Sequence, residues 1–126
     1  MAKTILIAED EPSLLKLLTK KITSLGYDVV AAHDGEEAID KIKTKKPDLM
    51  LLDIIMPKKN GLQVLQELRV NLSSNLPVII LSNLEKSQDI EAGKSYDVHD
   101  YIIKSNISIR ELSNRIVKLL AAQPAV

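Results

Sequence analysis

The chain has 126 residues, the size of one domain with one sizeable hydrophobic core. Its 17 basic and 17 acidic residues cancel, so we expect no direct nucleic-acid binding driven by net charge. The lack of cysteine excludes disulfides, thiolate metal sites and thiol nucleophiles. No stretch approaches the roughly 18 apolar residues of a membrane span, so neither export nor membrane insertion is expected.

Five short apolar runs alternate along the chain with longer segments of helical periodicity. The runs are rich in β-branched residues and are bounded by turn or charged residues, as is typical of strands buried on both faces. They cover residues 4–8, 28–32, 49–53, 78–82 and 101–104. This alternation predicts an α/β fold with a parallel sheet, right-handed crossovers and helices on both faces.

The first helix is predicted to begin at Pro12 and to stop at Gly26. Its apolar stripe consists of Leu14, Leu15, Leu17, Leu18, Ile22 and Leu25. The weakest helix candidate is the fourth, over residues 85–95, because it has few apolar positions and contains a glycine. We expect this segment to be short, mobile or irregular.

Capping residues predict where other helices begin. Asp34 and Glu37 have the spacing of a capping box before the second helix, and Ser108 and Glu111 repeat it before the fifth. A third helix is predicted to begin at residues 60–61. The chain end from residue 121 resembles a tail, which is either a natural end or the start of a linker.

Polar residues follow four of the five predicted strands. Glu9 and Asp10 follow the first strand, Asp53 ends the third, Ser82 ends the fourth and Lys104 ends the fifth. In open parallel sheets, ligands bind beyond the carboxyl ends of the strands, so these side chains are expected to meet. Carboxylates without His or Cys favour Mg²⁺, with Mn²⁺ as an alternative. The lysine and the serine suit a phosphoryl group, with Asp53 as the nucleophile.

Four segments of the chain together resemble the receiver domain of two-component response regulators, either a stand-alone CheY-like protein or part of a longer regulator. They occur in order and span nearly the whole chain: Ile5 to Pro12, Leu51 to Gly61, Val78 to Ser82 and Asp100 to Lys104. The resemblance implies a flavodoxin-like (βα)5 doubly wound fold with strand order 2-1-3-4-5. We expect this receiver domain over residues 1–122, with a short tail at 123–126.

The resemblance also implies a function and a set of site residues. The domain would accept a phosphoryl group on Asp53 from a histidine kinase or a histidine phosphotransfer protein, as part of a phosphorelay. Asp10 would bind Mg²⁺ directly, Glu9 would bind it through water, and Asp53 and the backbone carbonyl of Ile55 would be further ligands. The only catalysis expected is self-phosphorylation from phosphodonors and autodephosphorylation.

Activation, by the same resemblance, would work through movement toward the phosphoryl group. Ser82 and Lys104 would contact phosphate oxygens, and Tyr101 would turn inward, because phosphorylation adds about 1.5 to 2 negative charges. The surface of the fourth helix, fifth strand and fifth helix would then change and control an unidentified downstream protein. A cytoplasmic location is expected, with the chain as a monomer or a phosphorylation-dependent dimer.

Some positions depart from the commonest pattern of this family. Ser105 follows the lysine where proline is common, so a trans Lys104–Ser105 peptide is expected. Asn83 stands where a small residue is usual, and its side chain either restricts access to the phosphoryl group or binds it. Ile55 and Leu84 place apolar side chains beside the site, which predicts slow self-dephosphorylation. Asp97 and Val98 occupy the usual Gly-Ala position before the fifth strand.

Two other functions are disfavoured by the sequence. A Mg²⁺-dependent phosphohydrolase acting on small phosphate esters would need an acid two positions after the nucleophile, where the chain has Ile55. A degenerate, unphosphorylated interaction domain is disfavoured because every acid, metal and lysine position is filled. His33 and His99 are expected on exposed loops rather than in a metal site.

Overall fold

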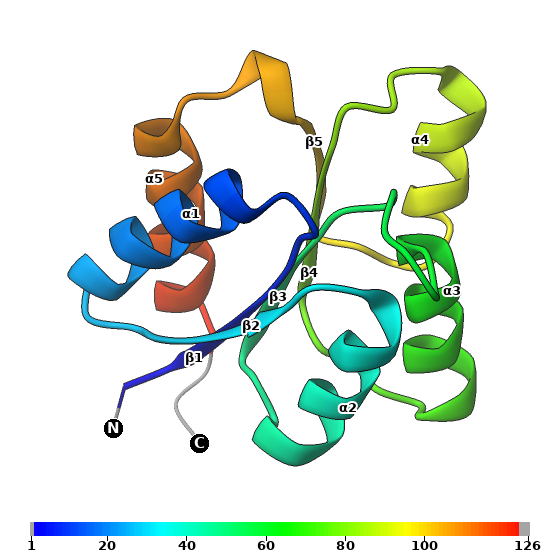
Figure 1. Cartoon of the computed structure of the whole chain (residues 1–126), viewed down its shortest axis with the longest axis horizontal. Helices are drawn as coiled ribbons and strands as arrows, with labels where there is room; N and C mark the ends of the chain where they lie inside the picture. Colours follow the sequence, from blue (N-terminus) through cyan, green and yellow to red (C-terminus); the bar gives the residue numbers. More distant parts are fainter. Residues whose placement is uncertain (1, 124–126) are drawn as a thin grey trace.

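A computed structural model describes residues 2–123 and shows one parallel sheet between two layers of helices (Figure 1). The five strands lie in the order β2-β1-β3-β4-β5, as the resemblance predicted. The strands are β1 (Thr4–Ala8), β2 (Asp28–Ala32), β3 (Leu49–Leu52), β4 (Val78–Ser82) and β5 (Asp100–Ile103). The helices are α1 (Pro12–Ser24), α2 (Gly35–Lys45), α3 (Gly61–Gln66), α4 (Ser87–Lys94) and α5 (Ile109–Ala121).

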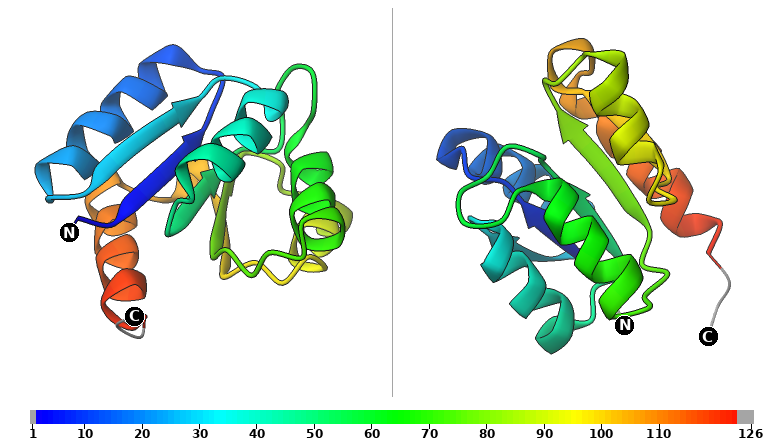
Figure 2. Two further views of the ribbon diagram at one scale, coloured as in Figure 1. Left: turned by 90° about the horizontal axis from the view of Figure 1, so that it is seen from below. Right: turned by 90° about the vertical axis from the view of Figure 1, so that its right-hand side faces the viewer.

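Each face of the sheet has its own apolar core. Successive strand residues point to opposite faces, so Ile5 and Ile7 pack with α1 and α5, whereas Leu6 and Ala8 pack with α2 and α3. Figure 2 shows these two helical layers from two further directions. Because both faces are covered, the central strands are apolar except for Thr4 and Ser82 at their ends, which is why they appear in the sequence as continuous runs. Within the described residues, the helices are all too short or too polar to cross a membrane.

Of the capping boxes predicted at the starts of α2 and α5, the N-cap half of each forms. The Asp34 carboxylate accepts a hydrogen bond from the Glu37 N–H at 2.8 Å, and the Ser108 hydroxyl accepts one from the Glu111 N–H at 3.1 Å. The Glu37 carboxylate lies 3.2 Å from the ring of His33, which is exposed as expected. These bonds satisfy backbone donors that the first turn of a helix leaves free.

The α3 start carries a capping box that was not predicted. Asn60 accepts from the Gln63 N–H, and the Gln63 side chain accepts from the Asn60 N–H, both at 2.9 Å. The helix continues through a π-helical turn, Glu67–Asn71. A buried leucine in that turn, Leu68, keeps this end of the helix packed on the sheet.

Several predicted element boundaries and faces were wrong. Strand β3 ends at Leu52, one residue before the prediction, and β5 lies one residue earlier than predicted. Helix α4 is shorter than the predicted 85–95, in keeping with its weak pattern. Leu17 is 52% exposed and Leu25 is 38% exposed, so the stripe of α1 is narrower than predicted. Only part of a helix surface can face the sheet, and Leu15, Leu18 and Ile22 fill that part.

The junction between α4 and β5 is held by an arginine from the end of α3. The Arg69 guanidinium donates hydrogen bonds to the carbonyl oxygens of Tyr96, Ser74 and Asp97 at 2.8, 3.0 and 3.1 Å. Asp97 has a left-handed backbone with φ of 57°. That conformation favours glycine, which explains why glycine is usual at this position in the family pattern.

Replacing Asp97 with glycine should therefore stabilise the domain. We expect Asp97→Gly to raise the free energy of unfolding by roughly 0.5–1 kcal/mol in urea titrations, because the left-handed conformation no longer crowds a Cβ atom. The Asp97→Asn variant removes the charge but keeps a side chain, so it should stay near the parent. Equal stabilisation by both variants would show that charge, and not backbone conformation, is responsible.

Candidate functional site

Four strands end at one edge of the sheet, and the loops that follow them surround a cavity of about 210 Å³. Parallel strands bring their carboxyl ends to a common edge, so residues far apart in the sequence become neighbours there. The cavity is lined by Glu9, Asp10, Glu11, Asp53, Ile55, Ser82, Asn83 and Lys104. The predicted site residues thus meet in one place, with the exception of Tyr101, which lies outside the lining.

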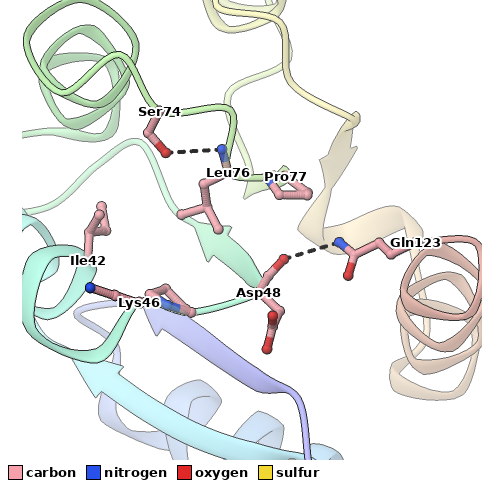
Figure 3. Close-up of a pocket in the computed structure, with 8 residues that line it drawn as sticks. Ile42, Lys46, Asp48, Ser74, Leu76, Pro77 and Gln123 are labelled. Carbon is pink, nitrogen blue, oxygen red and sulfur yellow. Dashed lines mark hydrogen bonds between the residues drawn. The ribbon is translucent and has the colours of Figure 1, made fainter. Parts of the chain in front are cut away.

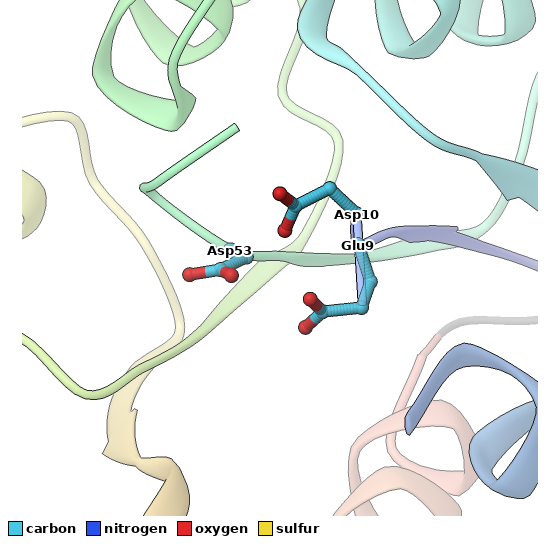
Figure 4. Close-up of side chains that lie close together, drawn as sticks. All are labelled: Glu9, Asp10 and Asp53. Carbon is cyan, nitrogen blue, oxygen red and sulfur yellow. The ribbon is translucent and has the colours of Figure 1, made fainter. Parts of the chain in front are cut away.

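Three carboxylates from β1 and β3 converge at this cavity (Figure 4). Glu9, Asp10 and Asp53 each offer an oxygen atom, and these atoms all lie within 4.8 Å of one another. Glu9 is 2% exposed and Asp53 is 6% exposed, whereas Asp10 is open to solvent. Like charges this close repel one another, so the cluster needs a compensating cation.

Lys104 supplies that positive charge in this structure. Its ammonium nitrogen lies 2.7 Å from Oε1 of Glu9 and 2.9 Å from Oδ2 of Asp53. One lysine from the end of β5 therefore bridges the carboxylates that follow β1 and β3. Removal of Lys104 would leave two buried carboxylates unpaired, whereas removal of one carboxylate would leave the lysine paired with the other.

Burial and charge act in opposite directions on these groups. Burial opposes the charge on Lys104, but its hydrogen bonds to Glu9 and Asp53 outweigh burial and raise its pKa above the ordinary lysine value. For Glu9, burial dominates and raises the pKa above the ordinary glutamate value, with repulsion from Asp53 adding to it. The contact with Lys104 and the Glu11 N–H, 3.0 Å from Glu9 Oε2, oppose that rise.

The backbone around Asp53 is fixed by close packing of the β3–α3 loop. The Asp53 N–H donates to the Ala8 carbonyl at 3.0 Å, and the Gly61 N–H donates to the Ile54 carbonyl at 2.7 Å. A Cβ atom on Gly61 would lie 2.5 Å from the Asp53 carbonyl oxygen, so only glycine allows this approach. The Ile55 N–H reaches Asp53 Oδ1 at 3.4 Å, while the Ile55 side chain is 61% exposed.

Ser82 and Tyr101 are both linked to the loop that follows β4. Ser82 is fully buried, and its hydroxyl accepts a hydrogen bond from the Leu84 N–H at 3.3 Å. The Tyr101 hydroxyl donates to the Leu84 carbonyl at 2.8 Å, and burial of the Tyr101 side chain raises its pKa. The sequence identified Ser82 and Tyr101 as site residues, but their common partner Leu84 was not foreseen in that role.

The trans Lys104–Ser105 peptide was predicted correctly, since the described chain contains no cis bond. The Ser105 N–H donates to the Asn83 side-chain oxygen at 3.1 Å, a contact between the loops after β4 and β5. Asn83 and Ser105 were each recognised as unusual, but no sequence signal indicated that they touch. The sequence indicated only that both residues follow strands that were expected to be neighbours in the sheet.

A larger cavity, of about 360 Å³, lies at the opposite edge of the sheet (Figure 3). Its polar contacts include a hydrogen bond from the Gln123 side chain to the Asp48 carbonyl at 3.3 Å and one from the Leu76 N–H to the Ser74 hydroxyl at 3.1 Å. The first bond connects a residue just after α5 to the residue before β3, and the second lies within the loop that precedes β4. These bonds support a structural role for this edge, whereas the predicted site residues lie at the edge that holds Asp53.

The donor set around Asp53 fits a divalent cation. Three carboxylates offer hard oxygen ligands, the kind that Mg²⁺ prefers, and one of them is open to solvent. Two of the three are buried beside a single lysine, so added positive charge would relieve their repulsion. The site can thus hold a cation and an anion side by side, as phosphoryl chemistry requires.

Comparison with known proteins connects this geometry to one family. The model of the response regulator receiver domain matches residues 5–117. The chain is 38% identical over 120 residues to the alkaline phosphatase synthesis transcriptional regulatory protein PhoP of Bacillus subtilis, covering 95% of this chain and 49% of PhoP. It is 40% identical over 116 residues to the probable transcriptional regulator ycf27 of Porphyridium aerugineum, covering 92% of this chain and 47% of that protein.

Solved structures agree with the sequence comparisons. The receiver domain of the Francisella response regulator 1452 matches with a TM-score of 0.86 and 33% identity, over 94% of this chain and 97% of that one. The BeF3-activated receiver domain of Klebsiella pneumoniae RstA matches with a TM-score of 0.83 and 28% identity, over 96% and 100%. The chain spans about half the length of the curated relatives it matches.

The raised pKa of Glu9 leads to a prediction about stability and pH. Its folded-state pKa lies above its unfolded value, so the parent should lose stability as pH rises through the window between the two values. Without divalent cations, Glu9→Gln should therefore be more stable than the parent at pH 7, and the gain should shrink at pH 4. Urea unfolding at both pH values measures this difference.

The matched control for this prediction is Glu11→Gln. Glu11 is exposed and takes part in the contact with Glu9 through its backbone N–H, so its neutralisation should change stability little at either pH. A Glu9→Gln variant less stable than the parent at pH 7 would show that the ion pair with Lys104 outweighs the burial of Glu9.

Proposed function

This chain belongs to the response regulator receiver domain family, whose general function is a phosphorylation switch in two-component signalling, and we propose that Asp53 is its phosphoacceptor. The observation that carries the assignment is the pairing of buried Asp53 with Lys104 at the end of β5, inside an acidic cavity. Asp53 belongs to the acidic cluster, pairs with Lys104 and accepts a hydrogen bond from the Ile55 N–H in the β3–α3 loop.

In the proposed reaction, a carboxylate oxygen of Asp53 attacks the phosphorus of a phosphohistidine on a partner kinase or phosphotransfer protein. A phosphorus–oxygen bond forms, the phosphorus–nitrogen bond breaks, and the departing imidazole takes a proton from solvent. Lys104 is close enough to balance the charge that gathers on the phosphoryl oxygens. Hydrolysis by water would return the Asp53 carboxylate and release inorganic phosphate.

Four groups are proposed to hold Mg²⁺ beside Asp53. Asp10 and Asp53 would bind directly, Glu9 through a water molecule, and the Ile55 carbonyl would complete the protein ligands. When bound, the ion supplies positive charge to the transferring phosphoryl oxygens. The exposure of Asp10 supports this assignment, because an incoming ion can reach that carboxylate first.

Ser82 and Tyr101 are proposed as the switch residues. The Ser82 hydroxyl oxygen accepts from the Leu84 N–H, and its own O–H would donate to a phosphoryl oxygen once the loop after β4 is drawn toward Asp53. That movement would disturb Leu84, whose carbonyl holds the Tyr101 hydroxyl. Tyr101 would then be free to turn inward and change the surface of α4, β5 and α5. Phosphorylation would favour the state with Tyr101 turned inward, because Ser82 contacts the phosphoryl group only in that state.

Partners of the whole protein are inferred from the family. A histidine kinase or histidine phosphotransfer protein would supply the phosphoryl group in the cytoplasm, and a downstream protein would read the altered surface. We propose that the receiver unit covers residues 1–122 and that 123–126 form a tail, of which 124–126 lie outside the described residues. The curated relatives are about twice as long as this chain, and in a longer protein of that kind the remaining segment would receive the signal.

Mass spectrometry tests the phosphoacceptor. Incubation with a small phosphodonor and Mg²⁺ should add one phosphoryl group to the parent and to the Asp100→Asn control, but none to Asp53→Asn. Asp100 is a suitable control because it pairs with Arg115 at 2.8 Å and does not line the cavity. A phosphoryl group on Asp53→Asn, or none on the parent, would rule out Asp53 as the acceptor.

The lifetime of the phosphoryl group provides a further prediction. Ile55 is exposed beside Asp53, so Ile55→Asn should leave the core intact while offering an amide that can hold an attacking water. We expect roughly a two- to tenfold faster loss of the phosphoryl group in the variant, within the range that one positioned polar group contributes. Ile55→Val is the matched apolar control. Equal or slower loss in Ile55→Asn would contradict the prediction.

A further inference from the structure

The hydrogen bond between Asn83 and Ser105 joins the two loops that flank Ser82 and Lys104. Strands β4 and β5 are paired with Ser82 opposite Ile103, so Asn83 and Ser105 come just beyond the end of the ladder. The Asn83 side-chain oxygen accepts the Ser105 N–H at 3.1 Å. A side-chain amide thus takes over where backbone pairing between the two strands ends.

The contact depends on the identity of both residues. A proline at position 105 would have no N–H to donate, and a small apolar residue at position 83 would have no acceptor. The Lys104–Ser105 bond is trans, and a short 3₁₀ turn, Lys104–Asn106, directs the Ser105 N–H toward the neighbouring loop. Two of the positions at which this chain departs from the family pattern therefore form one structural unit.

Asn83 also lines the cavity that contains Asp53. An exposed asparagine side chain ordinarily moves among rotamers within nanoseconds. The bond to Ser105 selects one of them, and in that rotamer the amide forms part of the cavity wall. Ile55 lines the same cavity, so both residues border the space that water shares with Asp53.

We propose that Asn83 is a positioning residue that restricts the access of water to phosphorylated Asp53, and that the Ser105 N–H holds it in that position. The inference deepens the proposed function and rests on it. In the hydrolysis that this arrangement slows, a water oxygen bonds to phosphorus, the bond from phosphorus to the Asp53 oxygen breaks, and one proton passes to solvent. Asn83 takes no part in those bond changes.

The size of the effect follows from the exposure of the bond. Both residues are exposed, and a neutral hydrogen bond in contact with water holds its partners only modestly. Loss of the bond should therefore shorten the lifetime of the phosphoryl group by about two- to fivefold. A much larger effect would indicate direct participation in the chemistry.

A double-mutant cycle tests the arrangement. The phosphoryl lifetime is measured by intact mass after removal of the phosphodonor, for the parent, Asn83→Ala, Ser105→Pro and the double variant. Each single change should shorten the lifetime, and Ser105→Pro should have no further effect in the Asn83→Ala background. Ser105→Ala keeps the N–H, so it should match the parent. Independent effects in the double variant, or a Ser105→Pro lifetime equal to that of the parent, would overturn the proposal.

Hydrogen exchange of the Ser105 amide gives a readout that does not need phosphorylation. Protection in the parent should be lost in Asn83→Ala and restored in Asn83→Asp, which keeps an acceptor oxygen. An unprotected Ser105 amide in the parent would overturn the inference while leaving Asp53 as phosphoacceptor. A parent that takes up no phosphoryl group would instead overturn the proposed function, and with it the role given to Asn83.

Discussion

The site depends on one lysine that bridges two buried carboxylates. Lys104 lies within 3 Å of both Glu9 and Asp53, and either acid would be a destabilising charge in an apolar setting without it. Three strands must end at the same edge of the sheet for this contact to form, because the three residues directly follow β1, β3 and β5. The same contact leaves the cluster with excess negative charge, which favours a cation there, and that cation together with Lys104 would offset the negative charge of a phosphoryl group.

Rigid and adjustable parts of the site lie on different loops. The β3–α3 loop is packed so closely that Gly61 has no room for a Cβ atom against the Asp53 backbone. The loops after β4 and β5 are instead joined by a few side-chain hydrogen bonds involving Leu84 and Asn83. A phosphoryl group on Asp53 would lie between the closely packed β3–α3 loop and the loops after β4 and β5, whose hydrogen bonds can exchange. We therefore expect the loops after β4 and β5 to move.

Much of the fold could be predicted because the sequence patterns that indicate it are local or repeat along the chain. Buried strands produced apolar runs, and Asp34 and Ser108 marked helix starts that the structure confirms. Strand ends shifted by one residue at Asp53 and Asp100, since pairing with a neighbour, and not composition, decides where a strand stops. Leu17 and Leu25 were predicted as part of the apolar stripe of α1 but are exposed, because a helical stripe in the sequence does not show how wide a contact the sheet offers.

The sequence by itself determined which chemical groups the domain has and, through the order of strands and helices, that Glu9, Asp10, Asp53, Ser82 and Lys104 would follow strands at one edge. Those properties depend on residue type and periodicity, which are local. The tertiary structure alone decided that Lys104 pairs with both Glu9 and Asp53, that Tyr101 and Ser82 share Leu84, and that Asn83 meets Ser105. Such contacts depend on side-chain directions and distances between separate strands, and these exist only once the sheet has assembled.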